Sequence, residues 1–242
     1  MPGSTYIALS GLRARMDQLD QLAADIANIG TAGYKGAHDV QAASERPVSS
    51  FADVLQTAID TTSDGQALDM RAGAIAPTGR PLDVALDGQG FFAVSTTGGV
   101  RYTRNGHFSR STSGNLTTDD GNPLLDTDGQ PITLGDGEVR IDNDGTVWSG
   151  TQQSGRLQVV GFGQPSAMVS TGPSLFSAPG QTAQPIDTPI MHAGSLEQSN
   201  VSMADRIAEL TSVSRGFEAM QKTMSVMLND VDARAIDVLG RR

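Results

Sequence analysis

The chain has 242 residues, 38% of them hydrophobic and 5% aromatic, and a formal net charge of −10; this length allows one large domain or two smaller ones. No run reaches the roughly 18 apolar residues of a membrane span, and the N-terminus lacks the basic and apolar segments of a cleavable signal peptide, so we expect neither. The acidic balance without a basic block argues against nucleic-acid binding, and the lack of cysteine excludes disulfides and thiolate metal sites.

The first predicted element is an N-terminal helix with a single apolar stripe. Its apolar residues recur at alternating intervals of three and four, as in the seam of a coiled coil; they are Leu9, Leu12, Met16, Leu19, Ala23 and Ile26. An isolated helix of this kind is marginal in water, so another element must cover the stripe. Farther along, residues 51–59 have the apolar spacing of a short helix that Ser50 would cap.

Turn signals and short apolar runs alternate between about residues 76 and 165. The chain has six Asp-Gly pairs, which predict hairpins with tight primed turns because Asp and Gly tolerate the positive φ that such turns need. The alternation in residues 82–87 predicts a strand with Leu82, Val84 and Leu86 in the core, followed by Phe91 and Phe92 on opposite sides. We therefore expect a compact antiparallel β domain, and then a Pro-, Gly- and Ser-rich loop or extended connector at residues 163–189.

A second long helix with a narrow apolar stripe is predicted at the C-terminus. Ser202 and Asp205 resemble a capping box, so the helix should begin near Ser202 and run to about Leu239. Its apolar residues recur about every 3.5 positions; they are Met203, Ile207, Leu210, Val213, Phe217, Met220, Met224, Met227, Val231, Ala235 and Val238.

Together these elements predict an α+β fold. A discontinuous helical, coiled-coil-like domain, made from residues 1–35 and 200–242, would flank a β-rich middle domain at residues 76–165. Residues 36–75 would form a connector with the short helix, and residues 166–199 an extended connector. The alternative is that both terminal helices pack on the β domain as ordinary core elements.

Pairing of the two terminal helices would cover part of each stripe, and other copies of the chain could cover the rest. The stripes then predict an assembly interface. Its expected residues are Leu9, Leu12, Met16, Leu19, Ala23, Ile26, Ile207, Leu210, Phe217, Met220, Met224, Met227 and Val231.

Motifs for catalysis or metal binding are missing from the sequence. The histidines, which are His38, His107 and His192, stand isolated, and no nucleophile elbow or P-loop occurs. The acidic loop at residues 142–145 does not fit an EF-hand, because Arg140 and Thr151 would stand at its first and twelfth positions. We therefore predict a protein that is not an enzyme and has no catalytic residue, cofactor or metal site.

Three blocks, in order along the chain, resemble the bacterial flagellar rod and hook proteins. The first comprises residues 22–28 and 31–35, the second residues 73–94 and 102–116, and the third residues 194–201 and 215–218. The residues on which the resemblance rests are Asn28, Gly33, Tyr34, Gly79, Leu82, Asp83, Asp87, Gly88, Gly90, Phe91, Phe92, Tyr102, Arg104, Gly106, Ser199, Asn200, Arg215 and Glu218. This axial family polymerises through paired terminal helices.

The resemblance implies a structural subunit of the flagellar basal-body rod that helps to form the drive shaft and export channel. The length leaves no room for the outer domains of hook proteins. The long C-terminal helix is more similar to that of the proximal rod protein, and the distal rod protein is the alternative. The implied partners are other copies of itself, neighbouring rod proteins, the surrounding ring proteins and the flagellar type III export apparatus. The implied location is the periplasmic rod, reached without a cleaved signal peptide. An alternative from another class is a soluble secreted β-rich binding protein.

Overall fold

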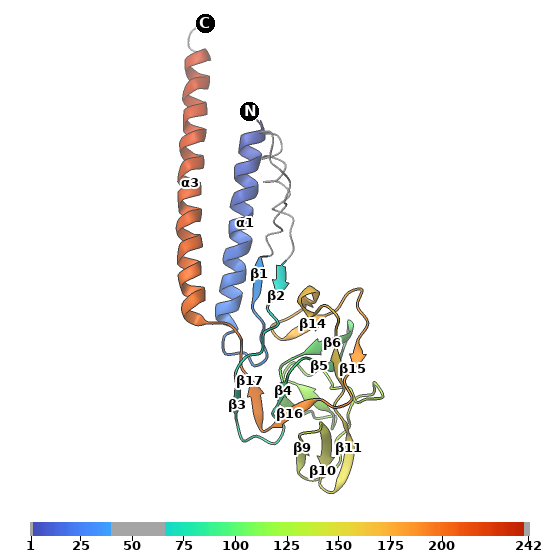
Figure 1. Ribbon diagram of the computed structural model, residues 1–242. Coiled ribbons are helices and arrows are strands. Elements are labelled where there is room, and N and C mark those ends of the chain that lie inside the picture. Colours follow the sequence, from blue (N-terminus) through green and yellow to red (C-terminus); the bar gives the residue numbers. More distant parts are fainter. Residues whose placement is uncertain (1, 40–65, 240–242) are drawn as a thin grey trace. The chain divides into compact units, whose positions relative to one another are not determined.

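The computed structural model describes residues 2–39 and 66–239. In these residues the chain has a helix at each end and a β-rich middle, as Figure 1 shows, so the prediction of an α+β composition is confirmed at this level. The chain divides into two compact units, which are described separately below. One unit contains both terminal helices; the other spans Ala27–His38 and Ala67–Ser202. The short helix predicted at residues 51–59 lies outside the described residues.

The helical unit contains α1 (Pro2–Ala27) and α3 (Met203–Leu239). Helix α3 begins and ends close to the predicted positions, with Asp205 in its first turn. Asp25 contacts Arg206, and a Cβ atom at Gly11 would lie 3.8 Å from the Met220 side chain. The end of α1 therefore lies beside the start of α3, and an earlier residue of α1 lies beside a later residue of α3. The two helices pair in antiparallel orientation. Neither helix, in the part that is described, is long and apolar enough to cross a membrane.

The β-rich unit is built around a six-stranded antiparallel sheet with the order β13-β14-β6-β5-β12-β15. Its strands are β5 (Phe91–Thr96), β6 (Gly99–Thr103), β12 (Val159–Gly161), β13 (Val169–Ser170), β14 (Leu175–Ser177) and β15 (Gln184–Pro185). A three-stranded sheet contains β9 (Val139–Ile141), β10 (Thr146–Ser149) and β11 (Gln152–Arg156). A single 3-10 turn, Pro165–Ala167, is described between β12 and β13.

Two-stranded ladders complete the arrangement. Strand β3 (Ile75–Pro77) pairs with β17 (Ser195–Glu197), β4 (Val84–Asp87) with β16 (Ile190–Ala193), and β7 (Phe108–Arg110) with β8 (Leu116–Thr118). Strand β1 (Ala37–Asp39) lies beside β2 (Gln66–Leu68). The ladders β3-β17 and β4-β16 bring the segment before α3 back to the first strands of the unit.

Residues 166–199 differ from the extended connector that we predicted. They contain strands β13 to β17, and β14 pairs with β6 while β16 pairs with β4. These strands have only two to four residues each, so their local sequence shows no clear two-residue period. The partners of β14, β16 and β17 are about 70 to 120 residues away in the sequence, and tertiary pairing decides the structure of these strands. How much of the predicted 76–165 domain would fold by itself stays a prediction.

Four hairpin loops share one backbone pattern, and it is not the tight primed turn that we predicted. In residues 111–115, 118–122, 126–130 and 142–146, the amide of the fourth residue, a glycine, donates to the carbonyl of the first. The amide of the first residue also donates to the carbonyl oxygen of the fifth residue. Among the described residues only glycines have positive φ. The loops therefore have three residues, a type I turn followed by a left-handed glycine. The residue before this glycine, which is Asp in three of the four loops, keeps its ordinary negative φ.

The core of the β-rich unit has two parts, one on each side of β5. Phe92 is fully buried and packs edge-on against Phe108, while Phe91 is 3% exposed and packs against Phe162 and Phe176. The prediction that Phe91 and Phe92 face opposite sides is confirmed. Strand β4 departs from simple alternation, because Ala85 is buried together with its neighbours Val84 and Leu86.

Candidate functional site

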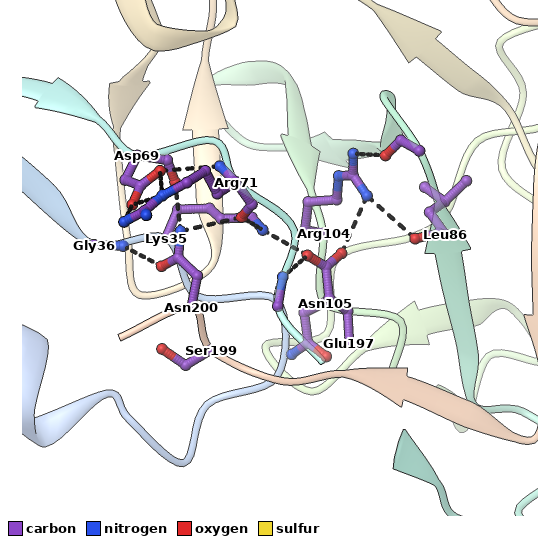
Figure 2. A network of polar contacts seen from close by, with 12 residues as sticks. Lys35, Gly36, Asp69, Arg71, Leu86, Arg104, Asn105, Glu197, Ser199 and Asn200 are labelled. Atoms are coloured by element: carbon purple, nitrogen blue, oxygen red, sulfur yellow. Dashed lines mark hydrogen bonds and ion pairs between the residues drawn. The ribbon is translucent and has the colours of Figure 1, made fainter. Parts of the chain in front are cut away.

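A buried polar network lies where three segments of the β-rich unit meet, and Glu197 at the end of β17 is its centre (Figure 2). The Glu197 side chain is fully buried. One carboxylate oxygen lies 2.5 Å from Lys35 Nζ and accepts a 3.0 Å hydrogen bond from the Gly73 amide. The other accepts a 3.1 Å bond from Arg104. A single carboxylate thereby joins residues that are far apart in the sequence.

Arg104 connects this network to the loop between β4 and β5. Its guanidinium donates to the Leu86 and Gly88 carbonyl oxygens, over 3.3 and 2.5 Å, in addition to Glu197. It also lies over the Phe91 ring, 5.3 Å from the centroid. Arg104 therefore contacts two other predicted family residues, Gly88 and Phe91.

Asn200 joins three chain segments through its side-chain amide. Its Oδ1 accepts a 3.0 Å hydrogen bond from the Gly36 amide. Its Nδ2 donates to the carbonyl oxygens of Asp69 and Arg71, over 2.7 and 3.1 Å. These contacts use both amide hydrogens and the amide oxygen, all with backbone groups, so Asn200 organises the local chain path.

Two cations and one anion are buried together in the network. Burial lowers the pKa of Lys35, although Glu197 acts in the opposite direction, and burial likewise lowers the pKa of Arg104. Nearby, the hydrogen bonds from the Arg71 side chain lower the pKa of Asp69 to about 2. Buried charges are tolerated only when they are paired and hydrogen-bonded, which makes the geometry around Glu197 specific.

Gly33 allows the N-terminal segment to approach this network. Its amide donates a 2.8 Å hydrogen bond to the Glu197 carbonyl oxygen, and its φ is +68°. A Cβ atom at this position would lie 2.3 Å from the Arg104 carbonyl carbon. Only glycine combines this left-handed backbone with such a close approach. The neighbouring Tyr34 is buried, and its carbonyl oxygen accepts a hydrogen bond from the backbone amide of Asn200.

Lys35 and Glu197 were not among the predicted site residues, although both stand in the blocks that resemble the rod family. Their side chains meet across 162 positions of sequence. The available signal was a single charge in each of the segments 31–35 and 194–201, and composition alone cannot pair two such charges.

A second polar cluster surrounds the predicted residue Asp83. This aspartate is 1% exposed; Thr78 Oγ1 donates to one of its oxygens over 2.7 Å, and His107 Nδ1 lies 2.8 Å from the other. Asp87, by contrast, is exposed at the end of β4, with His192 Nε2 3.4 Å away. Within the described part of the chain, no group of three or more His, Asp or Glu residues could hold a metal ion.

The other predicted family residues occupy turns, the core or the surface. Gly79, Gly88 and Gly90 have positive φ, and Gly106 lies against the β4 backbone. Leu82 packs on the core and Tyr102 on Phe162. Asn28 accepts a hydrogen bond from Thr31, and Ser199 accepts one from the Val201 amide. Arg215 and Glu218 are exposed on α3.

The predicted interface residues lie along both helices with different burial. Met16, Ile207 and Met220 are 50%, 46% and 42% exposed. Ala23 is also exposed, and the partly buried members are Leu12, Leu19, Ile26, Leu210 and Phe217. The side chains of Leu9, Met224, Met227 and Val231 are outside the described part.

Two family models match this chain. The model for the flagellar hook protein FlgE/F/G D1 domain matches residues 85–149, and the model for the flagellar basal body rod FlgEFG protein C-terminal region matches residues 192–230. The flagellar basal-body rod protein FlgF of Caulobacter vibrioides is 32% identical over 248 residues, covering 100% of this chain and 99% of the relative. The chain belongs to the flagellar basal-body rod protein family.

Other relatives agree with this assignment. FlgF of Rhizobium meliloti is 32% identical, with 99% of each chain covered, and FlgG of Bacillus subtilis is 31% identical, with 92% of this chain and 94% of the relative covered. The comparisons confirm the predicted structural rod subunit and support a proximal rod protein. They also place this rod protein in the flagellar basal body, where it assembles with other rod proteins. They favour this function over the alternative of a secreted β-rich binding protein.

Proposed function

We propose that this rod protein polymerises through its terminal helices, with other copies of itself and with neighbouring rod proteins, and so helps to form the drive shaft and export channel of the rod. The observation that carries this proposal is the apolar surface that remains on the helical unit. On these two helices Leu22 is 2% exposed and Val213 6% exposed. On the same helices Met16, Met203 and Ile207 are about half exposed.

Covering these side chains would supply much of the free energy of assembly. Full burial of one large apolar side chain contributes roughly 1.5–3 kcal/mol relative to exposure. Methionine is unbranched and can adapt to neighbours that are not identical, which suits a helical tube built from more than one rod protein. The occupant of this surface is accordingly a terminal helix of another rod subunit. Residues 1–35 and 200–242 would act as the assembly domain, and residues 76–165 as the centre of the β-rich domain.

The proposed location is the periplasmic rod, inside the surrounding ring proteins. We infer that the chain reaches it through the flagellar type III export apparatus without a cleaved signal peptide. A chain without cysteine cannot be trapped by disulfides when it enters an oxidising compartment, which supports this route. No catalytic step and no cofactor are part of the proposed function.

Deletion of the gene in its own organism, followed by complementation, tests the proposal. Deletion should abolish motility, and the full chain supplied in trans should restore it and be recovered in purified basal bodies. Normal motility after deletion, or restored motility with the protein absent from basal bodies, would contradict a role in the rod.

A further inference from the structure

Three chain segments that lead toward the terminal helices are tied together inside the β-rich unit. Residues 33–36 follow α1, residues 69–73 follow β2, and residues 197–200 precede α3. Glu197 binds Lys35 and the Gly73 amide, and Asn200 binds the Gly36 amide and the Asp69 carbonyl oxygen. Each of these two residues therefore joins all three segments.

We propose that Lys35, Glu197 and Asn200 form a clamp that holds these three segments together in the free subunit, before the helices meet any other rod protein. With the clamp closed, the chain leaves the β-rich unit toward α1 and toward α3 from neighbouring points. This inference rests on the proposed assembly through the terminal helices. It adds that the β-rich unit prepares the two helices to dock as a pair.

The closed clamp lowers the entropic cost of bringing α1 and α3 together. The end of α1 and the start of α3 are separated by about 175 residues, and bringing distant points of a flexible chain together costs entropy. When the clamp is closed, folding of the β-rich unit has already brought these points together, so pairing of the helices loses less entropy. The buried charges make the closed arrangement specific, because Lys35 has a fully buried carboxylate partner only when the segments are in register.

The clamp can be opened without removing the core of the β-rich unit. Lys35→Met leaves Arg104 and Glu197 as a balanced buried pair, and Arg104 keeps its contacts with the Leu86 and Gly88 carbonyl oxygens. Glu197→Gln would instead leave two buried cations without an anion, so it is the less suitable variant. Asn200→Ala removes hydrogen bonds without changing any charge. Each hydrogen bond contributes about a fivefold factor, so either variant should lower the ratio of closed to open clamp at least about tenfold.

A distance measurement on the full-length monomer tests the clamp directly. Because the chain has no cysteine, Gly30→Cys with Gln198→Cys provides two unique sites for nitroxide spin labels. A Cβ atom at Gly30 meets nothing within 4 Å, and Gln198 is exposed. Electron–electron double resonance should give a narrow distance distribution in the labelled parent and a broad one in Lys35→Met and Asn200→Ala. Arg71→Gln is the control, because it removes a neighbouring exposed cation and should leave the distribution narrow.

The same variants, without the label sites, are then assayed for incorporation into basal bodies. Hydrogen exchange of β5 and β6 should match the parent while incorporation falls in proportion to the fraction of subunits with a closed clamp, which the distance distribution measures. A distribution that stays narrow in both variants would overturn the clamp, and so would a broad distribution with normal incorporation. Loss of β5 and β6 protection in both variants would also overturn it, because the clamp would then be inseparable from the core. Failure of the unmodified chain to enter basal bodies would instead refute the proposed function, and the distance measurement would still decide whether the clamp exists.

Discussion

Arg206 Nε lies 3.0 Å from a carboxylate oxygen of Asp25, and the Asp25 side chain is fully buried. The other Asp25 oxygen accepts a 2.9 Å hydrogen bond from Gln21. A charged pair within an apolar seam specifies register, because a slip of one heptad would place Asp25 opposite Val213 and leave a buried carboxylate without a cation. This pair therefore selects one antiparallel alignment of α1 and α3.

Breaking the Asp25–Arg206 pair should destabilise the helical unit. Arg206→Met leaves the Asp25 carboxylate buried without its cation and should cost about 3 kcal/mol of helix-pair stability. Asp25→Leu combined with Arg206→Met should recover most of this loss, because apolar residues of similar size replace both charges. Helix melting of the full chain by circular dichroism measures both. Equal melting of Arg206→Met and the parent would show that the pair does not stabilise the register.

Substitutions at two adjacent positions of β4 should differ widely in their effect on the free energy of unfolding. Leu86 is 2% exposed in the core, so Leu86→Asp should lower the free energy of unfolding by more than about 4 kcal/mol, enough to unfold the β-rich unit. Asp87 is an exposed turn residue, so Asp87→Asn should change it by less than about 0.5 kcal/mol. Thermal melts of the full chain compare the two. A stable Leu86→Asp protein would refute the assignment of Leu86 to the core.

Gly33 and Gly30 form a matched pair for testing the close approach to Arg104. Gly33→Ala forces a Cβ atom against the Arg104 backbone and keeps a left-handed φ, so it should destabilise the β-rich unit by about 2 kcal/mol or more. Gly30→Ala meets open space and should be close to neutral. Urea unfolding of both variants gives the comparison. Similar midpoints would indicate that residues 33–36 do not pack as described.

The Asp69–Arg71 pair predicts a specific dependence on pH. The Arg71 side chain donates to both Asp69 oxygens and lowers the pKa of Asp69 from 3.8 to about 2. Since the folded state favours the charged carboxylate, this contribution to stability is present above about pH 4. It is lost as the pH falls toward 2. Arg71→Gln should raise the pKa toward 3.8, which NMR titration of the carboxyl carbon measures. An unchanged pKa would show that another group is responsible.

The helices and the two sides of β5 could be predicted from sequence because their patterns are local. The spacing of apolar residues indicates α3 directly, and Phe91 and Phe92 must face opposite sides of any strand. The loop type could not be predicted, because an Asp-Gly pair fits both two-residue and three-residue hairpins. Neither could the contact between Lys35 and Glu197, since it depends on how β3 and β17 pair across the whole unit.

The most direct test of the central claim, assembly through the terminal helices, is the recovery of Phe217→Asp in purified basal bodies. Phe217 is partly buried on the apolar stripe of α3, and a charge there should remove roughly 2 kcal/mol or more of burial. Ser212→Asp, at an exposed position of the same helix, is the matched control. In a strain without its own copy, we expect Phe217→Asp to be absent from basal bodies and the cells to be non-motile, with normal incorporation of Ser212→Asp and a folded β-rich unit in both. Normal recovery and motility with Phe217→Asp would contradict assembly through this stripe.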